Sequence, residues 1–110
     1  MLANGRYSAW FRIPARPEQE GMGVIMLADG ILEGSDGVIA YSGSYVQYGD
    51  AFTAKVATRR HTEGRPALFG IDEIDIELTG TSKNTTAACR GIVKQQPGLP
   101  LEVILLRMEG

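Results

Sequence analysis

Short glycine-containing segments that are typical of turns divide the first half of this chain into short strands. Glycines stand beside polar residues or tyrosines in Gly21-Met22-Gly23, Asp29-Gly30, Gly34-Ser35-Asp36-Gly37 and Tyr41-Ser42-Gly43-Ser44-Tyr45. Asp29-Gly30 is the clearest, because an Asp-Gly pair readily adopts the two positive φ angles of a tight hairpin turn and apolar runs flank it. Since every later apolar run is also short, the spacing predicts a meander of antiparallel strands.

Alternation of apolar and polar residues predicts eight strands. The most regular example is 73–79, where Ile74 and Ile76 fall on one face and acidic residues on the other. The expected strands cover residues 7–13, 24–27, 31–32, 38–47, 51–60, 73–79, 85–94 and 101–108. The proline-containing segments 14–20 and 95–100 are expected to be loops, because proline cannot donate to a strand ladder. Only 65–69 is compatible with a turn of helix.

The strand pattern predicts one all-β domain that spans residues 1–110. An eight-stranded antiparallel up-and-down barrel, the lipocalin-like architecture, would remove the exposed edges of an open sheet. A two-sheet sandwich is the alternative. The interior of an eight-stranded barrel is either packed by side chains or holds one small ligand. Whether it is filled or hollow is therefore the central question for function.

Composition excludes several classes of function. A net charge of −2 offers no basic surface, so nucleic acid is not an expected partner. No run approaches the ~18 apolar residues of a membrane span. The single cysteine, Cys89, cannot form an internal disulfide, and residues 1–7 lack the basic segment and uninterrupted apolar stretch expected of a secretory leader. We therefore expect a cytoplasmic protein.

The sequence contains no catalytic or metal-binding constellation. His61 is the only histidine and has no orienting partner in the pattern, and Cys89 has no adjacent base. The acidic residues Asp72, Glu73, Asp75 and Glu77 are expected to form a solvated outer face beside Arg59 and Arg60. We therefore predict a non-enzymatic protein without a cofactor or a metal.

Apolar and aromatic side chains on the inward faces are candidates for contact with a ligand. Tyr7 and Phe11 share one face of the first strand, and Ile74 and Ile76 share one face of the sixth. Aromatic rings can line a cavity, but they also fill ordinary cores. If the barrel is hollow, these four residues are predicted to contact a small apolar ligand.

Trp10 has the opposite parity to Tyr7 and Phe11, so it is expected to point outward. The first and last strands become neighbours when an up-and-down barrel closes. Trp10 would then share an outer patch with either Ile104 and Leu106 or Val103 and Leu105. Because aromatic residues are enriched at interface cores, we predict a homodimer with Trp10, Ile104 and Leu106 as interface candidates.

The order of the glycine and tyrosine signals resembles the GrlR-like family, small lipocalin-like barrels named for negative regulators of type III secretion. The matching signals are Gly5-x-Tyr7, Gly21-x-Gly23, Gly34-Ser35-Asp36 and Tyr41-x-Gly43. The resemblance implies a homodimeric barrel without catalysis that regulates by binding a transcriptional activator. The family's namesake carries an acidic Glu-Asp-Glu-Asp motif after this region, where the present chain has only Asp50. The contacts of the namesake's partner are therefore not carried over.

Two functions from different classes follow. The first is a binding or regulatory protein whose partner is another protein, such as a transcriptional regulator. The alternative is a carrier of a small apolar ligand in the barrel interior.

Overall fold

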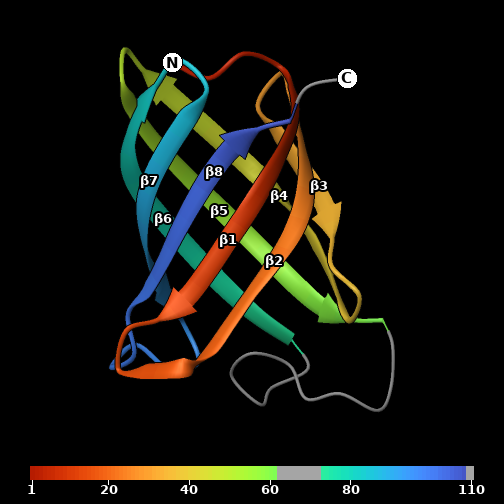
Figure 1. The fold of residues 1–110 in the computed structure, drawn as a ribbon, viewed down its shortest axis with the longest axis vertical. Helices are drawn as coiled ribbons and strands as arrows, with labels where there is room; N and C mark the ends of the chain where they lie inside the picture. Colours follow the sequence, from red (N-terminus) through yellow and green to blue (C-terminus); the bar gives the residue numbers. More distant parts are fainter. Residues whose placement is uncertain (62–72, 109–110) are drawn as a thin grey trace.

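The computed structural model describes residues 1–61 and 73–108, and every regular element in these segments is a β-strand. The strands are β1 (Gly5–Ile13), β2 (Arg16–Ala28), β3 (Ile31–Ser35), β4 (Ile39–Tyr48), β5 (Ala51–Arg60), β6 (Glu73–Lys83), β7 (Thr86–Val93) and β8 (Leu101–Arg107). Each pairs antiparallel with the next along the chain, and together they form a closed barrel (Figure 1). The predicted eight-stranded up-and-down barrel is confirmed. No helix in the described segments could cross a membrane.

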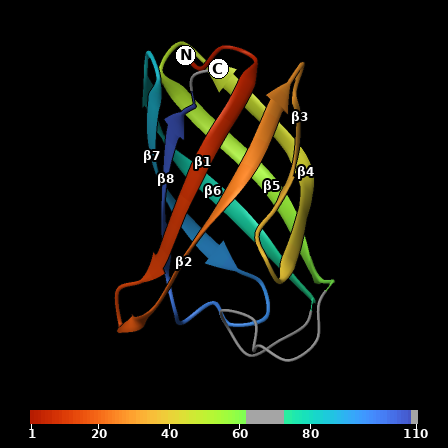
Figure 2. The same ribbon diagram turned by 45° about the vertical axis from the view of Figure 1, so that its right-hand side comes forward.

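The barrel closes where β1 meets β8, and both views show these strands side by side (Figures 1 and 2). Across this seam the Arg12 Nε atom lies 2.8 Å from Glu102 Oε2. At the end of the seam where β1 begins, the Met108 amide donates to the Arg6 carbonyl oxygen over 2.9 Å. Because β1 has a neighbour on both sides, the seam leaves neither strand with an open edge.

Tight turns join several strands where the chain adopts positive φ. Asp29 has a φ of 51° and Gly30 one of 85°, as the Asp-Gly signal predicted. Asn84 and Gly49 have φ values of 57° and 56° in the β6–β7 and β4–β5 turns. These residue types tolerate the left-handed region that side chains with a branched or bulky Cβ avoid.

The expectation of a loop over 14–20 was wrong. Only Pro14 and Ala15 form the turn, and β2 begins at Arg16. Pro17 fits in this strand because it has no register partner among the described strands, so no ladder bond needs its missing N–H. The third and sixth strands are also longer than predicted, and they end at Ser35 and Lys83. The possible helical turn at 65–69 lies outside the described residues.

Buried side chains pack against one another at one end of the barrel. At the end where β1 begins, Tyr7, Leu27 and Phe52 are fully buried, and the ring of Tyr45 stacks on that of Phe52 with centroids 5.7 Å apart. Leu2 is also buried there, and its amide donates to Gln47 Oε1 over 2.7 Å. The segment before β1 thus caps this end, which we call the filled end.

The acidic residues of β6 lie on the outer face, as predicted. Glu73, Asp75 and Glu77 are exposed, and Arg59 Nε on β5 lies 3.4 Å from Glu73 Oε1. Arg60 is partly buried instead of lying exposed beside them. Because the Arg59–Glu73 pair is exposed, it contributes at most about 1 kcal/mol to stability. Asp72 lies outside the described residues.

Candidate functional site

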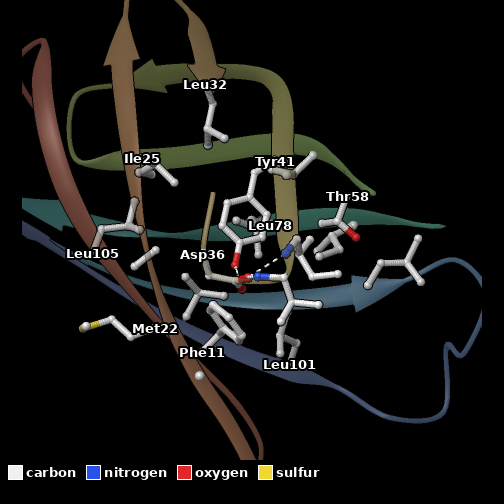
Figure 3. Close-up of a pocket in the computed structure, with 18 of the residues that line it drawn as sticks. Phe11, Met22, Ile25, Leu32, Asp36, Tyr41, Thr58, Leu78, Leu101 and Leu105 are labelled. Carbon is white, nitrogen blue, oxygen red and sulfur yellow. Dashed lines mark hydrogen bonds between the residues drawn. The ribbon is translucent and has the colours of Figure 1, made fainter. Parts of the chain in front are cut away.

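The other half of the barrel interior is hollow. A cavity of about 480 Å³ lies there, above the ~300 Å³ at which ligand pockets begin. Most of its lining is aliphatic and includes Ile25, Leu32, Leu78, Leu101, Val103 and Leu105 (Figure 3). The barrel is therefore filled at one end and hollow at the other.

The structure brings together three of the four residues predicted to contact a ligand. Phe11, Ile74 and Ile76 all line the cavity. Tyr7 does not, because it lies at the filled end and donates a 2.6 Å hydrogen bond from its hydroxyl to the Ala3 carbonyl oxygen. Tyr7 and Phe11 share one face of β1, but they are four positions apart along the strand, so they occupy different halves of the barrel.

Two glycines of β2 make room for the aromatic rings of the cavity. A Cβ atom on Gly21 would lie 2.6 Å from the Phe11 ring, and one on Gly23 would lie 2.8 Å from the Tyr41 ring. Both contacts are closer than real Cβ atoms allow. The two rings meet edge to face, with centroids 6.2 Å apart and an angle of 81°. Gly21 and Gly23 thus lie within a strand, where they let the two rings rest against its backbone.

A small group of polar side chains, which we call the polar wall, interrupts the apolar lining. It consists of Asp36, Tyr41 and Thr58. Asp36 Oδ1 accepts hydrogen bonds from the Val38 and Ile39 amides over 2.7 and 2.6 Å. The Tyr41 hydroxyl donates to Asp36 Oδ2 (Figure 3). Thr58 is buried and lies directly opposite Tyr41 in the β4–β5 register.

Burial raises the pKa of Tyr41 well above its usual range, and the hydrogen bond to Asp36 and the charge of that carboxylate raise it further. The phenol is therefore neutral at physiological pH. The four ligand-contact candidates drawn from the sequence did not include Tyr41, Asp36 or Thr58. The Gly34-Ser35-Asp36-Gly37 turn could have predicted the backbone hydrogen bonds of Asp36, because an aspartate in a turn commonly accepts hydrogen bonds from nearby backbone amides.

An apolar surface lies on the outside of β8, β1 and β2. We call it the outer patch, and it consists of Trp10, Met22, Val24, Met26, Ile104 and Leu106, all exposed. Trp10 lies directly between Met22 on β2 and Ile104 on β8, and its side chain is half exposed. The register selects Ile104 and Leu106 as the outward residues of β8, while Val103 and Leu105 point into the cavity.

The sequence reasoning did not assign the three β2 residues to this patch. The sequence indicates that these three residues share one face of the strand, since Met22, Val24 and Met26 alternate with Gly23 and Ile25. What was missing was the register that sets Met22 beside Trp10.

Cys89 and His61 are not among the residues that line the cavity. Cys89 is buried, and burial raises its pKa to about 11, so its thiol is protonated and unreactive at neutral pH. A ring nitrogen of His61 lies 3.1 Å from the Asp36 carbonyl oxygen. Within the described residues, no three His, Cys, Asp or Glu side chains are grouped to hold a metal ion.

Neither a family model nor a curated protein matches this chain. The hollow half of the barrel, the polar wall inside it and the outer patch are thus the features from which function is inferred.

Proposed function

We propose that this protein is a non-enzymatic binding barrel whose cavity holds one small apolar ligand. The observation that carries the proposal is the cavity of about 480 Å³ with its mainly aliphatic lining. An apolar molecule that enters it gains roughly 25 cal/mol for each Å² of apolar surface removed from water. A closed barrel holds such a cavity without rearrangement, so little of this gain is lost to ordering the protein.

Two features of the cavity support a defined ligand shape. The filled end closes one side of the space with Tyr7, Tyr45 and Phe52. Phe11 and Tyr41 form a rigid aromatic corner, because the two rings contact each other and rest against glycines. A ligand would therefore meet fixed walls rather than flexible side chains.

Binding of the neutral dye Nile red tests the proposal. Its fluorescence rises in an apolar site, and we expect saturable binding to the wild-type barrel. Ile76→Trp should weaken binding at least about tenfold, or ~1.4 kcal/mol, because the larger side chain occupies the cavity. Val103→Phe is a milder variant of the same kind. Circular dichroism should show that each variant remains folded.

Ile92→Trp is the matched control. Ile92 lies on the outer face of β7, so the same change from isoleucine to tryptophan can be made away from the cavity. Its side chain is half exposed and does not line the cavity. It should bind Nile red as the wild type does. Absence of saturable binding by the wild type would overturn the proposal, as would equal losses in Ile92→Trp and Ile76→Trp.

A second proposal is that the protein acts through other protein chains. The specific observation in its favour is the outer patch, since six large apolar side chains exposed together on three strands favour association. We propose that a second copy of the chain covers this patch in a homodimer related by a two-fold axis. Met22 belongs both to the outer patch and to the cavity lining, but the other five patch residues do not line the cavity, so both proposals can hold for one molecule.

The resemblance to GrlR-like proteins supports a regulatory partner as well. We propose that the dimer binds a transcriptional regulator in the cytoplasm, a location with which a single buried thiol is compatible. Affinity purification of the tagged protein from its host, with mass spectrometry, should recover a DNA-binding protein. Repeated recovery of the barrel alone would count against a regulatory partner and would leave ligand binding untouched.

A further inference from the structure

The hydrogen bonds of the polar wall have a fixed direction. Asp36 accepts from two backbone amides and from the Tyr41 hydroxyl, so its carboxylate acts only as an acceptor. The single proton of the Tyr41 hydroxyl is committed to Asp36. The phenolic oxygen therefore offers a ligand only its lone pairs, which can only accept a hydrogen bond.

The charges at the cavity have one sign. Among the described residues that line it, the only charged side chains are Glu20 and Asp36, and both are acidic. Arg60 follows Thr58 by two residues on the same face of β5, but it is not one of the lining residues. An anionic head group in the cavity would face two carboxylates, whereas a donor head group would meet acceptors.

The aromatic corner adds to this preference. Tyr41 contributes both its ring and its hydroxyl to the cavity wall, with Phe11 against it (Figure 3). The face of such a ring attracts a cation and repels an anion. A carboxylate beside these rings would lose its hydration without gaining a donor from the polar wall other than the Thr58 hydroxyl.

We propose that the cavity selects an apolar molecule whose head group donates hydrogen bonds, an alcohol or an amine, and discriminates against the corresponding carboxylate. This inference rests on the proposed ligand-binding function and names the chemistry of its ligand. The head group would lie at the polar wall and donate to the Tyr41 oxygen, and the apolar body would lie among the aliphatic side chains.

Displacement of Nile red by three molecules of equal chain length tests the proposal. Dodecanol, dodecylamine and dodecanoate are titrated at neutral pH, each below the concentration at which it forms micelles. Both donors should displace the dye at least about tenfold more effectively than dodecanoate, a difference of ~1.4 kcal/mol. Dodecanoate that displaces the dye as well as dodecanol would overturn the inference.

Variants of the polar wall show whether it is the source of the selection. In Tyr41→Phe and Asp36→Asn, the ratio of dodecanol to dodecanoate affinity should fall toward one. Ser42→Ala is the control, because Ser42 is exposed on the outer face of β4 beside Tyr41, and its ratio should match the wild type. An unchanged ratio in both wall variants would overturn the inference. Failure of Nile red to bind the wild type would instead overturn the ligand-binding function itself.

Discussion

At the scale of single residues, glycines decide where aromatic rings can lie. Gly21 and Gly23 point into the barrel, and the rings of Phe11 and Tyr41 occupy the space that their missing side chains leave. Tyr41 has little freedom to move aside, because its hydroxyl is bound to Asp36. The positions of the two rings in the cavity wall therefore depend on glycines, which have no side chain of their own.

Gly23→Ala should destabilise the fold by about 1–3 kcal/mol, the usual cost of overpacking a core. Its Cβ would lie 2.8 Å from the Tyr41 ring and 3.0 Å from the Ser35 carbonyl oxygen. Urea denaturation measures the change. Gly98→Ala is the control, since nothing lies within 4 Å of the added Cβ, and it should stay within ~0.5 kcal/mol of the wild type. Equal stability of the two variants would contradict the packing of Tyr41 on Gly23.

Cys89 should make stability depend on alkaline pH. Burial raises its pKa from 9.0 to about 11, so between these values the thiol ionises in the unfolded chain while it stays protonated in the fold. The unfolded chain then binds fewer protons, and stability falls as pH rises through this window. The urea midpoint should fall more for the wild type than for Cys89→Ala. Tyr41 is present in both proteins, so its titration affects both urea midpoints equally. Equal decreases of the midpoint in the wild type and in Cys89→Ala would show that Cys89 ionises equally in the folded and unfolded chains.

At the scale of strands, hydrogen bonding between β1 and β8 closes the barrel. The Arg12–Glu102 pair bridges this seam on the outer face, but the Arg12 side chain is exposed and that of Glu102 is partly exposed. Solvent screens such a pair, so the ladder and the core beneath it hold the seam.

A double-mutant cycle on Arg12→Ala and Glu102→Ala should give a coupling energy of about 0.2–1 kcal/mol. Chemical denaturation of the four proteins of the cycle supplies the values. Arg12→Ala combined with Glu77→Ala is the control, and these effects should add, because no ion pair joins the two residues. A coupling above ~2 kcal/mol for Arg12 and Glu102 would show that this ion pair, rather than the ladder, closes the barrel.

At the scale of the whole molecule, the barrel has two apolar surfaces with different roles. The cavity faces inward and the outer patch faces outward, and Met22 on β2 is the residue that they share. Apart from Met22, alternate residues of these strands belong to the two surfaces, so a change on one face need not disturb the other.

Sedimentation equilibrium at micromolar concentration should give the mass of a dimer. Trp10→Ala and Leu106→Glu should shift the mass toward that of the monomer. The first variant removes the central side chain of the outer patch, and the second places a charge within the patch. Tyr48→Ala and Val46→Glu are the matched controls on exposed positions of β4, outside the patch, and they should remain dimeric. A monomeric wild type, or a dimer that the patch variants leave intact, would exclude this interface.

The sequence by itself determined that eight strands form, which of their faces point inward and where the tight turn at Asp29-Gly30 lies, because these depend on neighbours within a few residues. It did not determine the full length of β2, β3 or β6. Alternation sent Ile74 and Ile76 inward and Trp10 outward, and the structure places them so. Closure into a barrel also followed, since eight short strands with tight connections have few other ways to cover their edges.

Only the tertiary structure decided which half of the barrel is hollow, which sets of residues meet across strands and which polar groups line the cavity. The register that sets Met22 and Ile104 beside Trp10 depends on strands far apart in the chain, and a slip of one residue would reverse every face. The space near Phe11, Tyr41 and Asp36 stays open because of how side chains of different strands fill a shared volume. Periodicity along one strand carries no information about that volume, so the cavity became visible only when the strands were assembled.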